Sequence, residues 1–161
     1  MAYNRTAAID YARKWALGRN PQYYDFEGTG GDCTAFASQC LYAGAGVMNY
    51  TRDVGWYYNS QYDRAAAWTG VEYFAKFLTT NKGSGPYGRF VPLYEVEPGD
   101  FIQLSFEDNV YSHTLLVMQV GEVPAPDNIL IAAHSFDSLY RPLDSYYYKD
   151  LRVVHIEGVR G

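Results

Sequence analysis

The sequence predicts an α+β fold in which N-terminal helices pack on a C-terminal antiparallel β-sheet. Two observations support this: apolar residues recur at helical spacing in the first half of the chain, and short apolar segments separated by turns fill the second half. A third is size, because 161 residues of which 48% are hydrophobic can bury a core of their own. No repeat or linker divides the chain, so we expect a single domain over residues 1–161.

The expected helices are marked by apolar periodicity and by capping residues. Residues 6–17, 33–44 and about 71–78 each carry an apolar face, and the first two segments stop at or just before a glycine. The residues that can cap these helices are Thr6, Asp32 and, in a capping box, Thr69.

The expected strands follow in the second half. Apolar or alternating segments bounded by turn residues cover 101–106, 113–120, 129–133 and 151–156. The connection over residues 121–128 contains two prolines and is short, so we expect the strands on either side of it to pair antiparallel. The start of one strand then lies beside the end of the next.

Composition excludes several classes of function. The net charge is −5, so the chain lacks the basic surface that nucleic acid or anionic lipid requires, and we expect no nucleic-acid partner. The longest apolar runs, such as Ile129–Ala133, are far shorter than the roughly 20 residues of a membrane span. An aromatic share of 17% excludes disorder. No signal peptide is recognisable at the start, which fits either an intracellular protein or a module of a longer exported chain.

Cys33 is the candidate nucleophile. It is expected in the first turn of a helix, after the glycine-rich loop 28–31. A helix N-terminus carries partial positive charge and free N–H groups, which lower the pKa of a thiol and can also bind an oxyanion. The alternative is that Cys33 is a small buried hydrophobe, since it also lies on the apolar face. Cys40, in mid-helix on that face, is interpreted as packing only; two helical turns, or about 10 Å, exclude a disulfide between the two cysteines.

A nucleophilic cysteine needs a base and a group that orients the base. His113 begins one expected strand and His134 ends the next, so antiparallel pairing brings them near each other. His113 is the candidate base, and His134 or Asp137 the candidate third group. His155 is expected on the open face of the last strand. The three histidines lack the His-x-His or His-x-x-x-His spacing typical of zinc sites, and residues 28–31 do not form a phosphate-binding loop, so we expect no metal and no cofactor.

Aromatic clusters occur at Tyr23–Tyr24, Trp56–Tyr58 and Tyr146–Tyr148. For any single residue we favour packing, although as a group they could form a cleft for sugar or peptide ligands. The candidate substrate-binding residues are Tyr24, Asp32, Trp56 and Ser112.

Several motifs resemble a known family. The segment Gly31–Cys40, which reads GDCTAFASQC, is similar to the D/N-C-T-N-F-x-S-Q motif of the bacterial putative amidase domain. That family resembles a branch of the papain-like cysteine hydrolases, near the NlpC/P60 and CHAP cell-wall peptidases. Further segments match the family in order over nearly the whole chain. They are Tyr3–Ala8, Pro98–Asp100, Ser112–His113, His134–Asp137 and Arg141–Leu143.

The resemblance implies a papain-like fold, with Cys33 as nucleophile and His113 as base. It leaves the third group open between His134 and Asp137, and it suggests an upstream tyrosine at Tyr23 or Tyr24. Ala35 departs from the family, which commonly has Asn there, so any contact of that amide is in doubt.

The leading hypothesis is therefore an amide hydrolase that acts on peptidoglycan peptides. By the resemblance it would be a monomeric module of an exported or cell-wall-associated protein. One alternative is a transglutaminase-like acyltransferase, in which an amine replaces water as the acceptor. Another is a non-catalytic domain that binds wall peptide or glycan, and a last one is an interaction domain in which Cys33 is simply buried.

Overall fold

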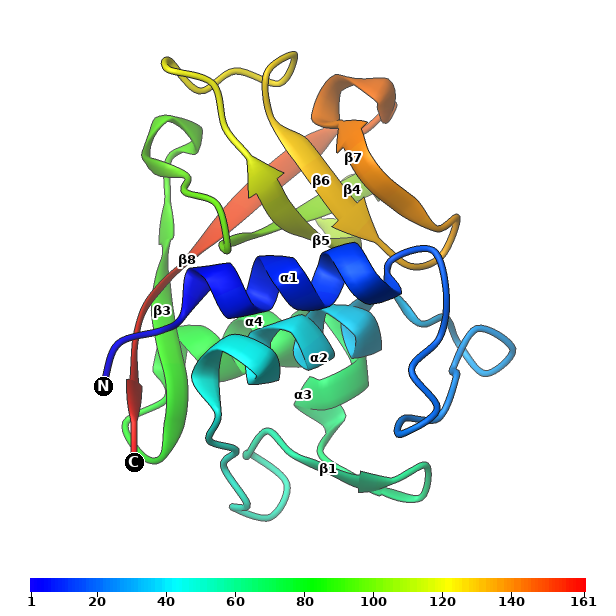
Figure 1. Cartoon of the computed structure of the whole chain (residues 1–161), viewed down its shortest axis with the longest axis vertical. Helices are drawn as coiled ribbons and strands as arrows, with labels where there is room; N and C mark the ends of the chain where they lie inside the picture. The colour runs from blue at the N-terminus through cyan, green and yellow to red at the C-terminus, as the bar shows by residue number, and fades with distance from the viewer.

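The computed structural model describes residues 1–161 as a layer of helices on one face of a six-stranded antiparallel sheet (Figure 1). The α+β class predicted from the sequence is confirmed. The helices are α1 (Arg5–Trp15), α2 (Cys33–Ala45), α3 (Ala66–Thr69) and α4 (Val71–Thr80). None of them combines the length and the apolar composition needed to cross a lipid bilayer.

The sheet has the order β3-β8-β4-β5-β6-β7, and every neighbouring pair is antiparallel. Its strands are β3 (Gly85–Val91), β4 (Phe101–Glu107), β5 (Val110–Gln119), β6 (Leu130–Ala133), β7 (Ser138–Pro142) and β8 (Asp150–Arg160). Outside the sheet lie a small hairpin and two 3₁₀ turns, namely β1 (Tyr58–Ser60) with β2 (Asp63–Arg64), η1 (Leu93–Glu95) and η2 (Leu143–Ser145).

Side-chain alternation along the strands gives the sheet two buried faces. Leu116 of β5 packs with Phe36 of α2 and Phe74 of α4 in the core between helices and sheet. Leu115 and Val117, the residues on either side of Leu116, belong to a second apolar cluster on the other face of the sheet. Consecutive residues of β5 therefore point to different environments, which decides where the site residues of this strand lie.

Two of the three helix starts differ from the sequence prediction, whereas α2 begins at Cys33 with Asp32 in the N-cap position as expected. The cap of α1 is Asn4, whose Oδ1 accepts the Ala7 N–H at 3.0 Å, and not Thr6. Asp32 occupies the N-cap position of α2, but its carboxylate makes no capping hydrogen bond. The expected capping box at Thr69 is absent too, because Gly70 is the N-cap of α4. At α1 and α4 the local pattern allowed a cap, but the nearby residues Asn4 and Gly70 occupy the N-cap positions instead.

The sequence reasoning missed the two edge strands, β3 and β7. Strand β3 opens with Gly85-Pro86, and β7 ends at Pro142. Glycine and proline are typical of turns, and proline in a sheet is tolerated mainly at edges. The same residues that argued against strands are the ones that edge positions accept.

Candidate active site

Cys33 is the first residue of α2, and its side chain is nearly buried. The preceding Gly30 and Gly31 have φ angles of 99° and 102°, a left-handed conformation that favours glycine. This turn brings the chain against the β6–β7 connection, where a Cβ on Gly31 would meet Ser135 Oγ at 3.4 Å. Cys33 itself is 9% exposed, and nearly the whole of α2 is buried beneath it. The helix N-terminus is thus enclosed between this loop and the sheet.

The polar neighbours of the Cys33 thiol are two threonines. Its Sγ lies 3.8 Å from Thr34 Oγ1, which in turn lies 2.9 Å from Thr114 Oγ1 on β5. Burial raises the pKa of Cys33, although the Thr114 N–H and the Thr34 hydroxyl favour the thiolate. The expected lowering of this pKa by the helix N-terminus is therefore outweighed by desolvation. The resting form of Cys33 at neutral pH is the thiol.

His113 precedes Thr114 on β5 and lies in register with Leu104 of β4. Alternation sends its side chain to the opposite face from Thr114, which contacts α2. The imidazole is 8% exposed, and its ring centroid lies 5.6 Å from that of Tyr146. Burial, together with the nearby Arg141 cation, lowers the pKa of His113 to about 4. His113 is therefore neutral at pH 7 and able to accept a proton.

A cleft of about 580 Å³ opens beside His113. Aromatic side chains form much of it, and two of them, Phe136 and Tyr147, are 90% and 97% exposed. The lining residues are Phe106, Ser112, His113, Ser135, Phe136, Arg141, Tyr146 and Tyr147. Such a mixture of aromatic surface and a few polar groups is typical of ligand sites.

Tyr146 lies beside His113 in the cleft. Its ring packs on His113, and burial raises the pKa of the Tyr146 hydroxyl, although the Arg141 cation opposes this. The Arg141 guanidinium stacks on the Tyr146 ring, with its Cζ 3.7 Å from the ring centroid. The sequence reasoning singled out neither residue for a role. Tyr146 belonged to a tyrosine cluster that we interpreted as packing, and Arg141 to a matching motif without an assigned function.

His134 pairs with Asp32 and not with His113. The antiparallel pairing of β5 and β6 is as expected. His134, however, points to the helices, where its ring stacks on Phe36 at a centroid distance of 4.0 Å. Its Nδ1 lies 2.5 Å from Asp32 Oδ2, and its Nε2 lies 3.0 Å from the Trp15 carbonyl oxygen. No hydrogen bond joins the two histidines.

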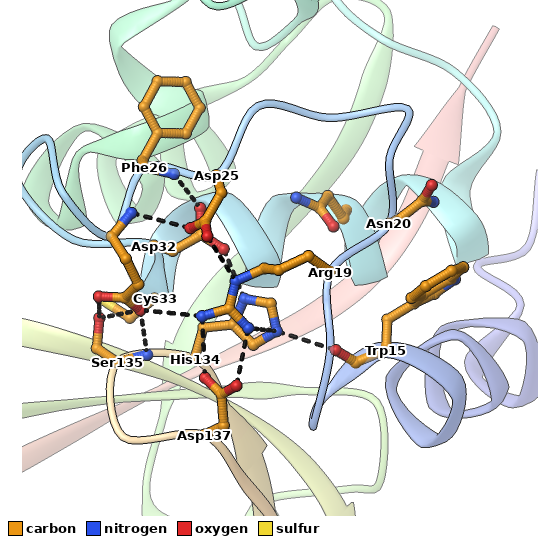
Figure 2. A network of polar contacts seen from close by, with 12 residues as sticks. Trp15, Arg19, Asn20, Asp25, Phe26, Asp32, Cys33, His134, Ser135 and Asp137 are labelled. Carbon is orange, nitrogen blue, oxygen red and sulfur yellow. Dashed lines mark hydrogen bonds and ion pairs between the residues drawn. The ribbon is translucent and has the colours of Figure 1, made fainter.

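Arg19 joins the loop before α2 to the β6–β7 connection (Figure 2). Its guanidinium forms ion pairs with Asp25 at 3.2 Å, Glu27 at 3.6 Å and Asp137 at 2.8 Å. Glu27 in turn accepts the N–H of Ser135 at 2.7 Å. Asp137 is thus held by Arg19 and makes no contact with His113. The network fixes the two segments that enclose the N-terminus of α2.

The remaining site candidates fall in different places. Ser112 is exposed and lines the cleft. Trp56 is fully buried, and its Nε1–H donates to Ser38 Oγ at 3.0 Å, so it packs in the core and cannot touch a ligand. Asp32 is 1% exposed and also accepts the Phe26 N–H, so its role is structural and it does not reach the cleft. Tyr24 lies on the loop before α2, with its ring edge-on to Phe26, outside the cleft.

The three histidines lie in separate environments. His155 Nδ1 lies 2.8 Å from the buried Asp100 carboxylate, which also pairs with Arg5. His113 faces the cleft, and His134 faces α2. No group of three or more His, Cys, Asp or Glu side chains is arranged to hold a metal ion.

Comparison with known proteins gives one family. The model of the family described as the putative amidase domain matches residues 2–156. A curated relative, the uncharacterized protein YhbB of Bacillus subtilis (strain 168), is 33% identical over 142 residues. The match covers 86% of this chain and 43% of the relative, so the chain spans less than half of that protein's length. No solved structure matches.

Proposed function

Because the chain belongs to the putative amidase domain family, we propose that it hydrolyses amide bonds with Cys33 as nucleophile and His113 as general base. The observation that supports the proposal is that Thr114, whose N–H favours the Cys33 thiolate, directly follows His113 on β5. The Thr114 N–H acts on the Cys33 thiol, and His113, the preceding residue, forms the wall of the cleft. A helix N-terminus and a strand thus present the two groups from rigid elements.

The proposed reaction starts with the Cys33 thiol and the His113 imidazole both uncharged. Because burial raises the pKa of Cys33 and lowers that of His113, the proton leaves Sγ for the imidazole as the sulfur attacks the amide carbonyl carbon. The new S–C bond leaves an oxyanion, which accepts a hydrogen bond from the Cys33 backbone N–H at the start of α2. The imidazolium gives its proton to the leaving amine as the C–N bond breaks. Water, deprotonated by His113, then releases the acid and restores the thiol.

In this proposal the residues around Arg19 hold the nucleophile in place. Asp32 directly precedes Cys33, and His134 ties its carboxylate to the sheet side of α2. Asp137 holds the β6–β7 connection in place through its ion pair with Arg19. We assign His134 and Asp137 as positioning residues that act through these contacts, while the aromatic ring of Tyr146 borders His113 directly.

The proposed substrates are peptides of bacterial peptidoglycan. The motif resemblance to papain-like cell-wall hydrolases supports this class. The open aromatic rim of the cleft, with Phe136 and Tyr147, suits an extended peptide better than a small molecule. We propose on the same grounds that the fold is papain-like and that the domain acts as part of an exported protein.

The test is amine release from muropeptides. Purified peptidoglycan fragments are incubated with the protein, new primary amines are quantified, and the products are identified by mass spectrometry. We expect cleavage by the native chain and by Cys40→Ala, and none by Cys33→Ala. Cys40 is the matched control because it lies on the same helix but is fully buried in the core.

The possible outcomes separate the alternatives. Cleavage that persists in Cys33→Ala would overturn the mechanism. Products in which an added amine replaces water would indicate an acyltransferase. Binding of the fragments without cleavage by any variant would favour a non-catalytic binding domain, a result consistent with the near burial of Cys33.

A further inference from the structure

We infer that Arg141 forms a subsite for a carboxylate of the substrate, next to the amide that is cleaved. The inference rests on the proposed function and narrows its substrate class to acidic peptides. Arg141 lines the same cleft as His113 and Ser112 and lies near the end of β7.

The guanidinium of Arg141 is held rigidly but without an acidic partner. Its Nε donates to Ser145 Oγ at 2.7 Å, its Nη2 to the Ser145 carbonyl oxygen at 3.3 Å, and its plane stacks on Tyr146. Its Nη1 has no hydrogen-bond partner in the protein, and no carboxylate lies within ion-pair distance. A planar cation fixed in this way is pre-organised for a carboxylate, because little side-chain entropy remains to be lost on binding.

Arg19 is an example of an arginine whose charge is compensated by acidic side chains of the protein. That arginine is surrounded by three carboxylates, so its charge is already compensated within the protein. The chain as a whole is acidic, with a net charge of −5, and yet no acid has been placed beside Arg141. An uncompensated cation facing an aromatic cleft selects for an anionic ligand.

The position of Arg141 also couples ligand charge to the base. The Arg141 cation contributes, after burial, to the low pKa of His113. A carboxylate bound to Arg141 offsets that contribution and makes His113 a stronger base when an acidic substrate is present. The other ionisable side chains that line the cleft are those of Tyr146 and Tyr147, which cannot be cations, so no second cation of the lining would mask the effect.

Two alkylating reagents that differ in charge test the subsite on the intact chain. Iodoacetate carries a carboxylate next to its reactive carbon, and iodoacetamide is its neutral counterpart; with both, Cys33 sulfur displaces iodide. We expect the iodoacetate-to-iodoacetamide rate ratio at Cys33 to fall by about tenfold in Arg141→Gln, as suits the loss of one charge-assisted contact. Arg89→Gln is the matched control, because it removes the same charge from exposed β3. Equal ratios in the two variants would overturn the subsite.

A binding measurement tests the Arg141 subsite without relying on the reactivity of Cys33. The His113 imidazole is titrated by NMR with N-acetylglycine or with the neutral N-acetylglycinamide. We expect only the carboxylate probe to raise the pKa of His113, and Arg141→Gln to abolish that response. A response to both probes, or one that survives in Arg141→Gln, would refute the subsite. If neither alkylating reagent labels Cys33 faster than Cys40, the proposed nucleophile fails, while the NMR result still decides on Arg141.

Discussion

At Cys33 two physical effects oppose each other, and burial is the stronger. The N-terminus of α2 and the hydrogen bonds of Thr34 and Thr114 favour a thiolate, but desolvation raises the pKa of the thiol above its ordinary value. A glycine-rich loop before a helix indicates the first effect in the sequence. The second depends on how closely residues 134–137 cover the helix start, which a local pattern does not reveal.

The pH profile of Cys33 alkylation follows from this balance. A raised pKa means that the thiolate fraction at neutral pH is smaller than that of a free thiol. We therefore expect the iodoacetamide rate at Cys33, measured by mass spectrometry against free glutathione, to keep rising above the pH at which glutathione levels off. Cys40, fully buried, should not react at any pH that leaves the fold intact. A plateau of the Cys33 rate near neutral pH would instead demonstrate a thiolate–imidazolium pair.

At the scale of elements, strands β5 and β6 show which features of a sheet a sequence pattern predicts and which it does not. Their apolar runs predicted both strands and their antiparallel pairing, and both are present. The pairing placed His113 near His134, but it did not specify the faces to which they point. His113 shares a face with Leu115 and Val117, whereas His134 shares one with Thr114. A shift of one residue in register reverses such an assignment, and only the assembled sheet fixes it.

The contact between α2 and the end of β6 depends on Asp32, which leads to a prediction about stability. Asp32→Ala removes the partner of the buried His134 Nδ1 and of the Phe26 N–H. We expect a loss of about 3 kcal/mol in the free energy of unfolding, because both partners stay buried and unpaired. Urea denaturation measures it. Asp10→Ala, which breaks the exposed pair with Arg13, should lower stability far less. Equal losses in both variants would contradict a structural role for Asp32.

For the whole molecule, the sequence predicts helices followed by a sheet but not the edge strands β3 and β7, and it predicts the candidate site only in part. Cys33 and His113 stand out in the sequence because few residues of their type are present. Cys33 begins α2, whereas β5 starts at Val110, so His113 lies inside its strand and not at the expected start. Trp56 stands out equally but lies in the core. Its burial could not be predicted, because a single aromatic residue in a sequence does not indicate whether its side chain is exposed. Arg141 and Tyr146 become notable only when β7 and the segment after it fold back over His113.

The burial of His113 affects the stability of the entire domain, and this effect has a definite sign. Its pKa is about 4 in the folded chain and near 6.5 when exposed, so between these values the unfolded state binds more protons. The free energy of unfolding should therefore fall as the pH drops from about 6.5 to about 4, by at most about 3 kcal/mol from this residue. Urea denaturation at both ends of this window measures the change. His113→Gln, which does not titrate, should show a smaller loss on acidification. An identical loss in the variant would mean that other groups, such as the carboxylates around Arg19, dominate the acid response of the fold.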